Sequence, residues 1–263
     1  MTTAAPVILS HDGLISTITV NRPDALNALD RETLQALLDA SHEIRERGLE
    51  KTRAVIFRGA GGKAFVAGAD IKLMQRAALP ELGDFISLGQ TVMRRIEELP
   101  QVTIAAIDGF AFGGGLELAL ACDFIVATPK AKLGQAETKL GLIPGFGGTQ
   151  RLGQRVSIGT LRKLVFLADP VGGEEGARIG LVDYLVPSEG LDAKLLEITQ
   201  SLLARGPLAI ASAKRCIDIT HRAGLDLGLQ KEIDEFLRLF SHQDTKEGLA
   251  AFVEKRAATF QGK

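Results

Sequence analysis

Residues 102–123 read VTIAAIDGFAFGGGLELALACD, and this stretch decides the fold. Its first six residues are a continuous run of β-branched and small apolar side chains, which predicts a strand buried on both faces. Glycines 113–115 then precede LELALAC, whose composition favours a helix. A helix N-terminus presents backbone N–H groups without intrahelical partners, and glycines there let another molecule approach the backbone. The stretch therefore predicts a site for a phosphate, a carboxylate or a developing oxyanion.

Glu117 is the acid within this apolar helix, and it follows the glycines by about one turn. In that position its carboxyl group would lie beside whatever the helix N-terminus binds. The same residues also fit a tight crossing of a helix over a sheet, with Glu117 at the rim. The stretch alone leaves both interpretations open.

Two further stretches have the same character. FVAGADIK, residues 65–72, is a second junction at which small residues lead from a strand into a helix, so the two junctions could converge. GQAETKLGLIPGFGGTQRL, residues 134–152, is rich in glycine and contains Glu137, a second candidate acid that could face Glu117.

The remaining pattern divides the chain. Pro80 and Gly83 break helices, so we expect residues 73–83 to be irregular or only partly helical and a candidate for a mobile pocket wall, with a helix over about residues 84–99. From about residue 189 onward four amphipathic helices follow without strands. We therefore predict a catalytic core of α/β type over residues 1–188 and a helical region over residues 189–263. The apolar sides of the last helices exceed what one tail can bury, which predicts docking on the core or on another subunit.

Composition excludes several classes of protein. The 263 residues carry 31 basic and 32 acidic side chains, and a net charge of −1 gives no general attraction for nucleic acid or an anionic membrane. Cys122 and Cys216 are far apart, which fits a reducing, cytoplasmic compartment. No run of about 18 uncharged apolar residues predicts a membrane span. The four histidines lack metal-ligand spacing, so we expect no metal.

With both junctions, both acids and the helical tail considered together, the sequence resembles the crotonase (enoyl-CoA hydratase/isomerase) family essentially from end to end. The motifs that carry the resemblance are NRPDALNAL (21–29), AFVAGADIK (64–72), IDGFAFGGGLELALACD (107–123), GQAETKLGLIPGFGGTQRL (134–152) and EGLAAFVEKR (247–256). The implied fold is a right-handed spiral of ββα units with C-terminal helices that form trimers, or dimers of trimers.

The resemblance also assigns roles to individual residues. It implies that the backbone N–H groups of Ala69 and Gly114 form an oxyanion hole for the thioester. It implies that Glu117 orients and deprotonates a water molecule, that Glu137 supplies the proton to Cα, and that the backbone of Gly145 helps to place the water. By analogy, coenzyme A would lie along the first two motifs, with contacts from Ala25, Ala67, Ile71 and Lys72. No other cofactor is implied, because coenzyme A enters as part of the substrate.

The expected reaction is the syn-addition of water to a trans-2-enoyl-CoA. One alternative is double-bond isomerisation, which needs a single base, whereas the two glutamates favour hydration. Another is RNA binding through the first long helix, as in some relatives, but that helix balances acids against bases. The motifs look most similar to those of 3-methylglutaconyl-CoA hydratases, which act on a branched, carboxylated acyl group. The sequence leaves two acyl groups possible for the substrate: that one and a simple short chain. Lys72, Arg76 and Lys139 are the basic candidates for a distal carboxylate.

Overall fold

The computed structural model describes residues 4–263, and the side chains of all of these except 220–222. Its strands form two sheets. The larger, in spatial order, consists of β1 (Val7–Asp12), β2 (Ile15–Val20), β3 (Ala54–Gly59), β5 (Val102–Ile107), β7 (Phe124–Ala127) and β10 (Tyr184–Leu185). The smaller consists of β4 (Ala64–Val66), β6 (Phe110–Phe112), β8 (Lys132–Gly134) and β9 (Val171–Gly172). Strands β2, β3, β5, β7 and β10 pair in parallel, and the β1–β2 hairpin is antiparallel.

The chain visits the two sheets in alternation. Each of the strand pairs β3–β4, β5–β6 and β7–β8 places one strand in the large sheet and the next in the small sheet. Helices return the chain to the large sheet after β4 and β6, and after β8 they lead to β9 of the small sheet. Neighbouring units add parallel strands side by side in both sheets. This repeated ββα spiral confirms the fold class that the sequence predicts.

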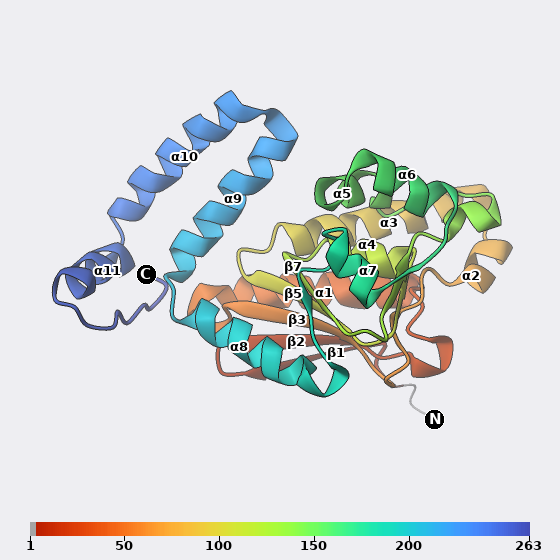
Figure 1. Ribbon diagram of the computed structural model, residues 1–263, viewed down its shortest axis with the longest axis horizontal. Helices are drawn as coiled ribbons and strands as arrows, with labels where there is room; N and C mark the ends of the chain where they lie inside the picture. Colours follow the sequence, from red (N-terminus) through yellow and green to blue (C-terminus); the bar gives the residue numbers. More distant parts are fainter. Residues whose placement is uncertain (1–3) are drawn as a thin grey trace.

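Helices cover the sheets and extend beyond them (Figure 1). Asp30 caps the first long helix, and its carboxylate accepts a hydrogen bond from the Thr33 N–H at 2.8 Å. The helices are α1 (Arg31–Lys51), α2 (Ile71–Arg76), α3 (Leu79–Glu97), α4 (Gly114–Leu120), α5 (Gly148–Arg155), α6 (Ile158–Phe166), α7 (Gly173–Arg178), α8 (Leu191–Leu203), α9 (Pro207–Ala223), α10 (Leu225–Phe240) and α11 (Gln243–Val253), with the short 3₁₀ turns η1 (Pro23–Ala25), η2 (Glu137–Leu140) and η3 (Ser188–Gly190).

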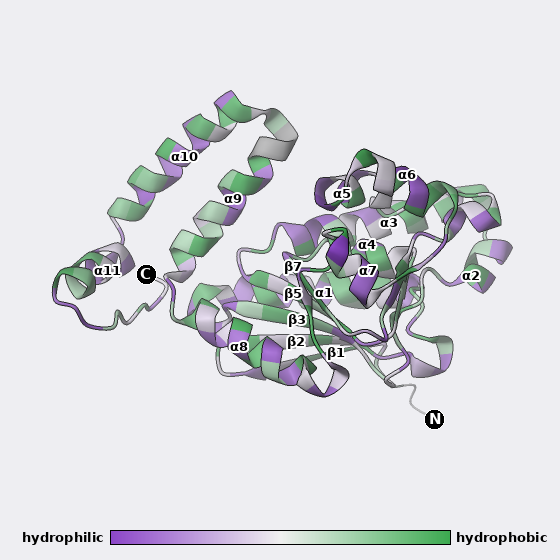
Figure 2. Ribbon diagram, viewed as in Figure 1, coloured by the Kyte–Doolittle hydropathy of each residue, from purple (hydrophilic) through white to green (hydrophobic). Residues whose placement is uncertain are grey.

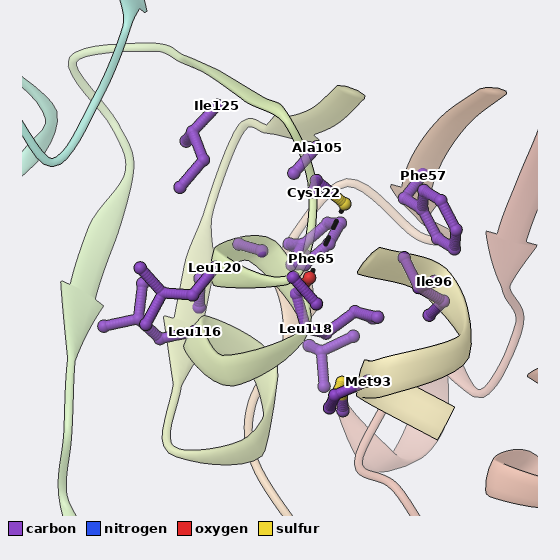
Figure 3. Packing of buried hydrophobic residues seen from close by; sticks show 14 of the residues in the cluster. Phe57, Phe65, Met93, Ile96, Ala105, Leu116, Leu118, Leu120, Cys122 and Ile125 are labelled. Carbon is purple, nitrogen blue, oxygen red and sulfur yellow. Dashed lines mark hydrogen bonds between the residues drawn. The ribbon is translucent and has the colours of Figure 1, made fainter. Parts of the chain in front are cut away.

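Helix α4 is enclosed by the core, and all seven of its residues are buried. Figure 3 shows its leucines among buried residues of the large sheet, of β4 and of α3. Such a helix has no solvated face, so its sequence is apolar all round except for Glu117. The most enclosed helix of the core therefore carries a carboxyl group.

Of the two expectations for residues 73–83, the irregular segment is wrong and the partly helical one holds, because Ala77 and Ala78 separate α2 from α3. The start of the second helix is predicted too late. Helix α3 starts at Leu79 rather than Asp84, and Pro80 occupies its first turn, where the missing N–H of proline costs no hydrogen bond. The Glu81 carboxylate accepts a hydrogen bond from the Ala78 N–H at 3.0 Å and closes the N-terminus. Gly83 faces open space and is tolerated within the helix. Neither residue therefore prevents the helix here: Pro80 would break a helix only beyond its first turn, and Gly83 only lowers its stability.

The C-terminal helices divide into two groups. Helix α8 packs its Leu195 and Ile198 on a second apolar cluster with β3, β5 and β7. Helices α9 and α10 form a hairpin that projects away from the core, and α11 follows the end of α10, at the open end of the hairpin opposite its turn (Figure 1). On α9, Lys214 donates to Asp123 at 2.7 Å and ties the hairpin to the core. Figure 2 shows apolar residues along the projecting helices, and those most exposed are Ile217, Leu225, Leu227, Leu229, Ile233, Phe236, Leu237, Phe240, Leu249, Phe252 and Val253.

Among the described residues, no helix combines the length and the apolar character that crossing a membrane requires.

Candidate active site

The three glycine-rich stretches meet at one cavity of about 210 Å³. Two carboxyl groups, Glu117 and Glu137, line it together with Ala69 and Gly114. The rest of its wall is largely apolar and comes from Ala67, Ile71, Met74, Ile86, Phe112, Ala136, Leu140, Leu142, Ile143 and Phe146, with Gly68, Gly113 and Gly145. The convergence that the sequence suggests is therefore present in the fold.

Backbone donors reach this cavity from two junctions. Leu29 forms a parallel β-bridge with Ala69. In this bridge the Leu29 N–H donates to the Gly68 carbonyl and the Leu29 carbonyl accepts from the Asp70 N–H, both at 2.8 Å. In such a parallel bridge the N–H of the middle residue, Ala69, points away from Leu29. Gly114 is the first residue of α4, so its N–H has no intrahelical acceptor. The site thus contains two backbone donors suited to a developing negative charge.

The glycines before α4 are required by two close approaches. A Cβ at Gly115 would lie 1.9 Å from the carbonyl oxygen of Val66, so any side chain would push α4 off the small sheet. Gly113 has φ +48, and a Cβ there would lie 2.7 Å from Oε1 of Glu137. The glycine run therefore both seats the helix and leaves room for the second carboxylate.

Glu117 is buried, with 1% of its surface exposed, and backbone hydrogen bonds hold its carboxyl group. Its Oε1 accepts hydrogen bonds from the N–H groups of Phe146 at 2.8 Å and Gly148 at 2.7 Å, at the start of α5. Burial raises the pKa of Glu117 to about 7, the two backbone hydrogen bonds oppose that rise, and the charge of Glu137 adds to it. At neutral pH this carboxyl group is therefore poised to exchange a proton, and the interpretation of Glu117 as a residue at the rim of the fold is wrong.

Glu137 opens the turn η2 on the other side of the cavity and is half-buried. Burial raises its pKa above the usual value, against the opposing effect of backbone hydrogen bonds at Glu137 and Ala136. Gln135 is 1% exposed, and with its amide nitrogen turned toward Glu137 it donates to the two carboxylate oxygens at 3.2 and 3.1 Å. The second acid is therefore oriented by a buried amide.

Sequence reasoning missed these supporting groups. The Gly145 carbonyl accepts a hydrogen bond from the Gln90 side chain at 2.9 Å. The Phe146 ring packs edge-on against Phe85, with ring centroids 5.5 Å apart. Gly148 starts α5 directly after Gly147, which repeats the pattern of glycine before a helix, and that pattern could have marked a second helix N-terminus beside Glu117. No comparable signal marks Gln90 or Gln135.

The residues that the resemblance assigns to coenzyme A fall into two groups. Ala67 and Ile71 line the cavity, and the structure does not bring Ala25 or Lys72 to its wall. Ala25 ends the turn η1, where its N–H donates to the Arg22 carbonyl at 3.0 Å. Lys72 lies exposed on α2. Any contact that these two residues make is therefore outside the cavity that contains the acids.

The first motif, residues 21–29, is fixed from within. Asn27 is fully buried, and its side-chain nitrogen donates to the carbonyls of Ala60 and Ala64, both at 2.9 Å. Its side-chain oxygen accepts from the Arg22 N–H at 2.9 Å. Arg22 also pairs with Asp70, the N-cap of α2, at 3.4 Å. These bonds hold the loop against the junction that supplies Ala69.

The three basic candidates for a distal carboxylate do not reach the described cavity wall. Lys72 and Arg76 are exposed on α2, and Lys139 pairs with Asp169 at 3.6 Å. The cavity therefore offers an apolar end and two acids, but none of these three cations.

Known proteins resemble the chain over nearly its whole length. The model of the family described as Enoyl-CoA hydratase/isomerase matches residues 11–263. A crotonyl-CoA hydratase of Syntrophomonas wolfei is 41% identical, with 98% of each chain covered. A mitochondrial methylglutaconyl-CoA hydratase of Mus musculus is 39% identical, over 92% of this chain and 78% of the mouse protein. A crystal structure of an enoyl-CoA hydratase from Bacillus anthracis superposes with a TM-score of 0.94 at 37% identity, over 98% of this chain and all of that one.

Proposed function

Because the chain belongs to the enoyl-CoA hydratase/isomerase family and is an enoyl-CoA hydratase, we propose that it adds water reversibly to a short, apolar trans-2-enoyl-CoA to give the 3-hydroxyacyl-CoA. One observation carries this proposal: two carboxyl groups and two backbone donors converge on a single apolar cavity. Hydration needs both acids, whereas isomerisation needs only one base.

In this proposal the N–H groups of Ala69 and Gly114 bind the thioester carbonyl oxygen. As the water oxygen attacks Cβ, a new C–O bond forms. The electrons of the Cα=Cβ double bond shift toward the carbonyl group and give an enolate, whose negative charge lies on the thioester oxygen. The donors bind the oxyanion more strongly than the neutral carbonyl, so they lower the barrier by about 2.7–4 kcal/mol each. Because they belong to the backbone, a change of side chain leaves them in place.

Glu117 takes the proton of the attacking water, and Glu137 delivers a proton to Cα as the enolate collapses. Each transfer contributes about 10²–10⁴-fold as general acid or base catalysis. The raised pKa of about 7 at Glu117 supports its role, since a base of that strength accepts a proton readily and is still partly ionised at neutral pH. Proton exchange with solvent then restores the starting charges of the pair. The backbone of Gly145, on the cavity wall, helps to place the water.

Of the two acyl groups that the sequence leaves open, the cavity supports the simple short chain. A distal carboxylate would enter a wall of Met74, Ile86, Leu140, Leu142 and Ile143 in the presence of two acids. Burying a charge without a partner is costly, and like charges add to that cost. A crotonyl chain meets neither penalty.

The test compares kcat/KM for crotonyl-CoA with that for 3-methylglutaconyl-CoA on the same preparation of enzyme. We expect crotonyl-CoA to be preferred by at least about 10-fold, the effect of about 1.4 kcal/mol. Ile86→Lys provides a matched variant, because it brings a cation to the wall and should narrow the ratio. A wild-type ratio in favour of the carboxylated substrate would overturn the choice of acyl group, and no hydration of either would overturn the function.

The proposal also covers the cofactor, compartment and assembly of the enzyme. Coenzyme A serves only as part of the substrate, and no metal takes part. Cys122 and Cys216 lie far apart in the sequence, which fits a reducing, cytoplasmic compartment. The exposed apolar residues of α10 and α11 support a homo-oligomer, a trimer or a dimer of trimers, in which these helices pack on another subunit. The balanced charges of α1 support the absence of a nucleic-acid partner.

A further inference from the structure

Arg151 of α5 lies one layer behind the cavity, against the turn that holds Glu117. Its side chain is 14% exposed. Nη1 donates a hydrogen bond to the Phe146 carbonyl at 3.0 Å. Nε and Nη2 donate to the two carboxylate oxygens of Glu97 on α3, at 3.3 and 3.2 Å. One guanidinium group therefore joins α3 to this turn.

The carbonyl that Arg151 binds occupies a particular place in the turn. It belongs to the peptide between Phe146 and Gly147, and the peptides on either side supply the N–H groups of Phe146 and Gly148 that bind Glu117. Because each peptide is planar, fixing the middle one restricts the angle between the two donors. A Cβ at Gly147, whose φ is +110, would lie 2.2 Å from Nη1. The guanidinium is therefore packed directly on the turn.

Glu97 supplies the orientation of the guanidinium. A carboxylate that accepts two parallel hydrogen bonds fixes the plane of an arginine, which a single carbonyl does not. Glu97 is 23% exposed, so solvent screens this pair less than it screens a surface pair. The same helix also holds the neighbouring residue of the turn, through the hydrogen bond from Gln90 to the Gly145 carbonyl. Helix α3 thus acts as the frame for the turn.

We propose that Arg151, oriented by Glu97, is a positioning residue for Glu117: it fixes the turn at Phe146–Gly148 so that both N–H groups converge on Oε1 and leave Oε2 for the reacting water. The proposal rests on the proposed function of Glu117 as the base. A loosened turn would let the carboxylate rotate, and a misplaced base loses rate without losing substrate binding.

The charges around Glu117 give the proposal a second readout. Glu137 on η2 raises the pKa of Glu117, and Arg151 on α5 lowers it. Glu97 on α3 faces Arg151 and offsets part of its charge. Removing the guanidinium therefore raises the pKa of Glu117 further, and the pH below which the base is protonated moves upward.

The experiment compares wild type with Arg151→Met, Arg151→Lys and Glu97→Gln, using crotonyl-CoA as the substrate. For Arg151→Met we expect kcat to fall by about 10- to 100-fold, the scale of a misplaced catalytic group, with KM unchanged and the limb of the pH profile that reports Glu117 shifted to higher pH. Arg151→Lys keeps the charge and should recover part of kcat. Glu97→Gln should fall between, and the double variant Glu97→Gln/Arg151→Met should be no worse than Arg151→Met. Arg94→Met, which removes an ion pair between exposed Arg94 of α3 and Glu98 just after that helix, is the control and should match wild type.

A measurement without turnover separates this proposal from the proposed function. The ionisation of Glu117 is followed by infrared spectroscopy of ¹³C-labelled glutamate carboxyl groups, with Glu117→Gln identifying the band. If wild type hydrates no enoyl-CoA, the function fails, but an upward pKa at Glu117 in Arg151→Met still supports the positioning role. A folded Arg151→Met with wild-type kcat, pH profile and Glu117 pKa overturns it. If Arg151→Met does not fold, wild-type behaviour of both Arg151→Lys and Glu97→Gln overturns it.

Discussion

The N–H of Gly148 donates a hydrogen bond to Oε1 of Glu117 at 2.7 Å, so the N-terminus of α5 binds the carboxyl group carried by α4. The two helices come from different ββα units, and each begins directly after a glycine. A helix N-terminus carries a partial positive charge, which stabilises an anion. This contact offsets part of the cost of burying Glu117 and fixes the direction of its other oxygen.

Glu117→Gln and Glu137→Gln should each lower kcat by at least about 10²-fold, the minimum expected for general acid or base catalysis. In Glu117→Gln the amide oxygen still accepts both backbone N–H groups, so the fold should persist and only proton transfer is lost. Initial rates with crotonyl-CoA and circular dichroism check both points. The double variant should be far less than multiplicatively worse, because the two acids act on one water molecule. Retention of more than about a tenth of kcat in either single variant, against that minimum, would show that the residue is misassigned.

The dependence of kcat on pH should be bell-shaped. Glu117 must be ionised to act as the base, and its pKa is raised from 4.5 to about 7, so one limb of the profile should lie near pH 7. Glu137 must be protonated to act as the acid, so activity falls as the pH rises through its raised pKa. Both limbs report the coupled pair. A profile with neither limb near pH 7 would contradict the raised pKa of Glu117.

The ionisation of Glu117 should also lower the stability of the fold as the pH rises. The pKa of Glu117 is higher in the folded state than in the unfolded state, so stability that is fully present below pH 4.5 is lost as the pH rises through about 7. The loss amounts to about 3 kcal/mol, since one pKa unit is worth about 1.4 kcal/mol. Glu117→Gln lacks this ionisation. Denaturant unfolding of both proteins at acidic and neutral pH should therefore show the variant gaining on wild type as the pH rises, and parallel curves would contradict the prediction.

Gly113→Ala should impair catalysis more than it impairs folding. Its Cβ would lie 2.7 Å from Oε1 of Glu137, so the carboxylate must move. The positive φ adds a backbone cost of about 1–2 kcal/mol. Gly13→Ala is a matched control, because Gly13 has φ +55 in the first hairpin with no atom within 4 Å of the added Cβ. Thermal unfolding should show similar losses for both variants, whereas kcat should fall only in Gly113→Ala. Equal kcat in the two variants would remove Gly113 from the site.

Phe236→Asp should weaken self-association. Phe236 is 67% exposed on α10, within the apolar surface that the projecting helices present. A charge there would be buried by any subunit that packs on this surface, at a cost that exceeds the gain from the contact. Light scattering after size exclusion should show an oligomer for wild type and smaller species for the variant. Ile8→Asp, on an isolated exposed residue of β1, is the control. A monomeric wild type would exclude the proposed assembly.

The prediction from sequence succeeded where a local rule is sufficient. Uninterrupted apolar runs become the central strands, as at Val102–Ile107, where every residue is buried. The strand-free pattern after residue 189 becomes α8–α11. The rule failed at Pro80 and Gly83, because the effect of a proline depends on its distance from the helix N-terminus, and a boundary is poorly marked in the sequence.

The sequence by itself determined that glycines precede helices at two junctions and that lone acids stand beside them, because backbone access and the scarcity of acids in apolar helices are local properties. Only the tertiary structure decided what holds each acid. Glu117 and Gly148 are far apart in the chain, and so are Glu97 and Arg151. Such pairs are specified by how the ββα units stack, which depends on the packing of the whole core. The pKa of Glu117 follows from the same packing, since burial by surrounding units is its largest cause.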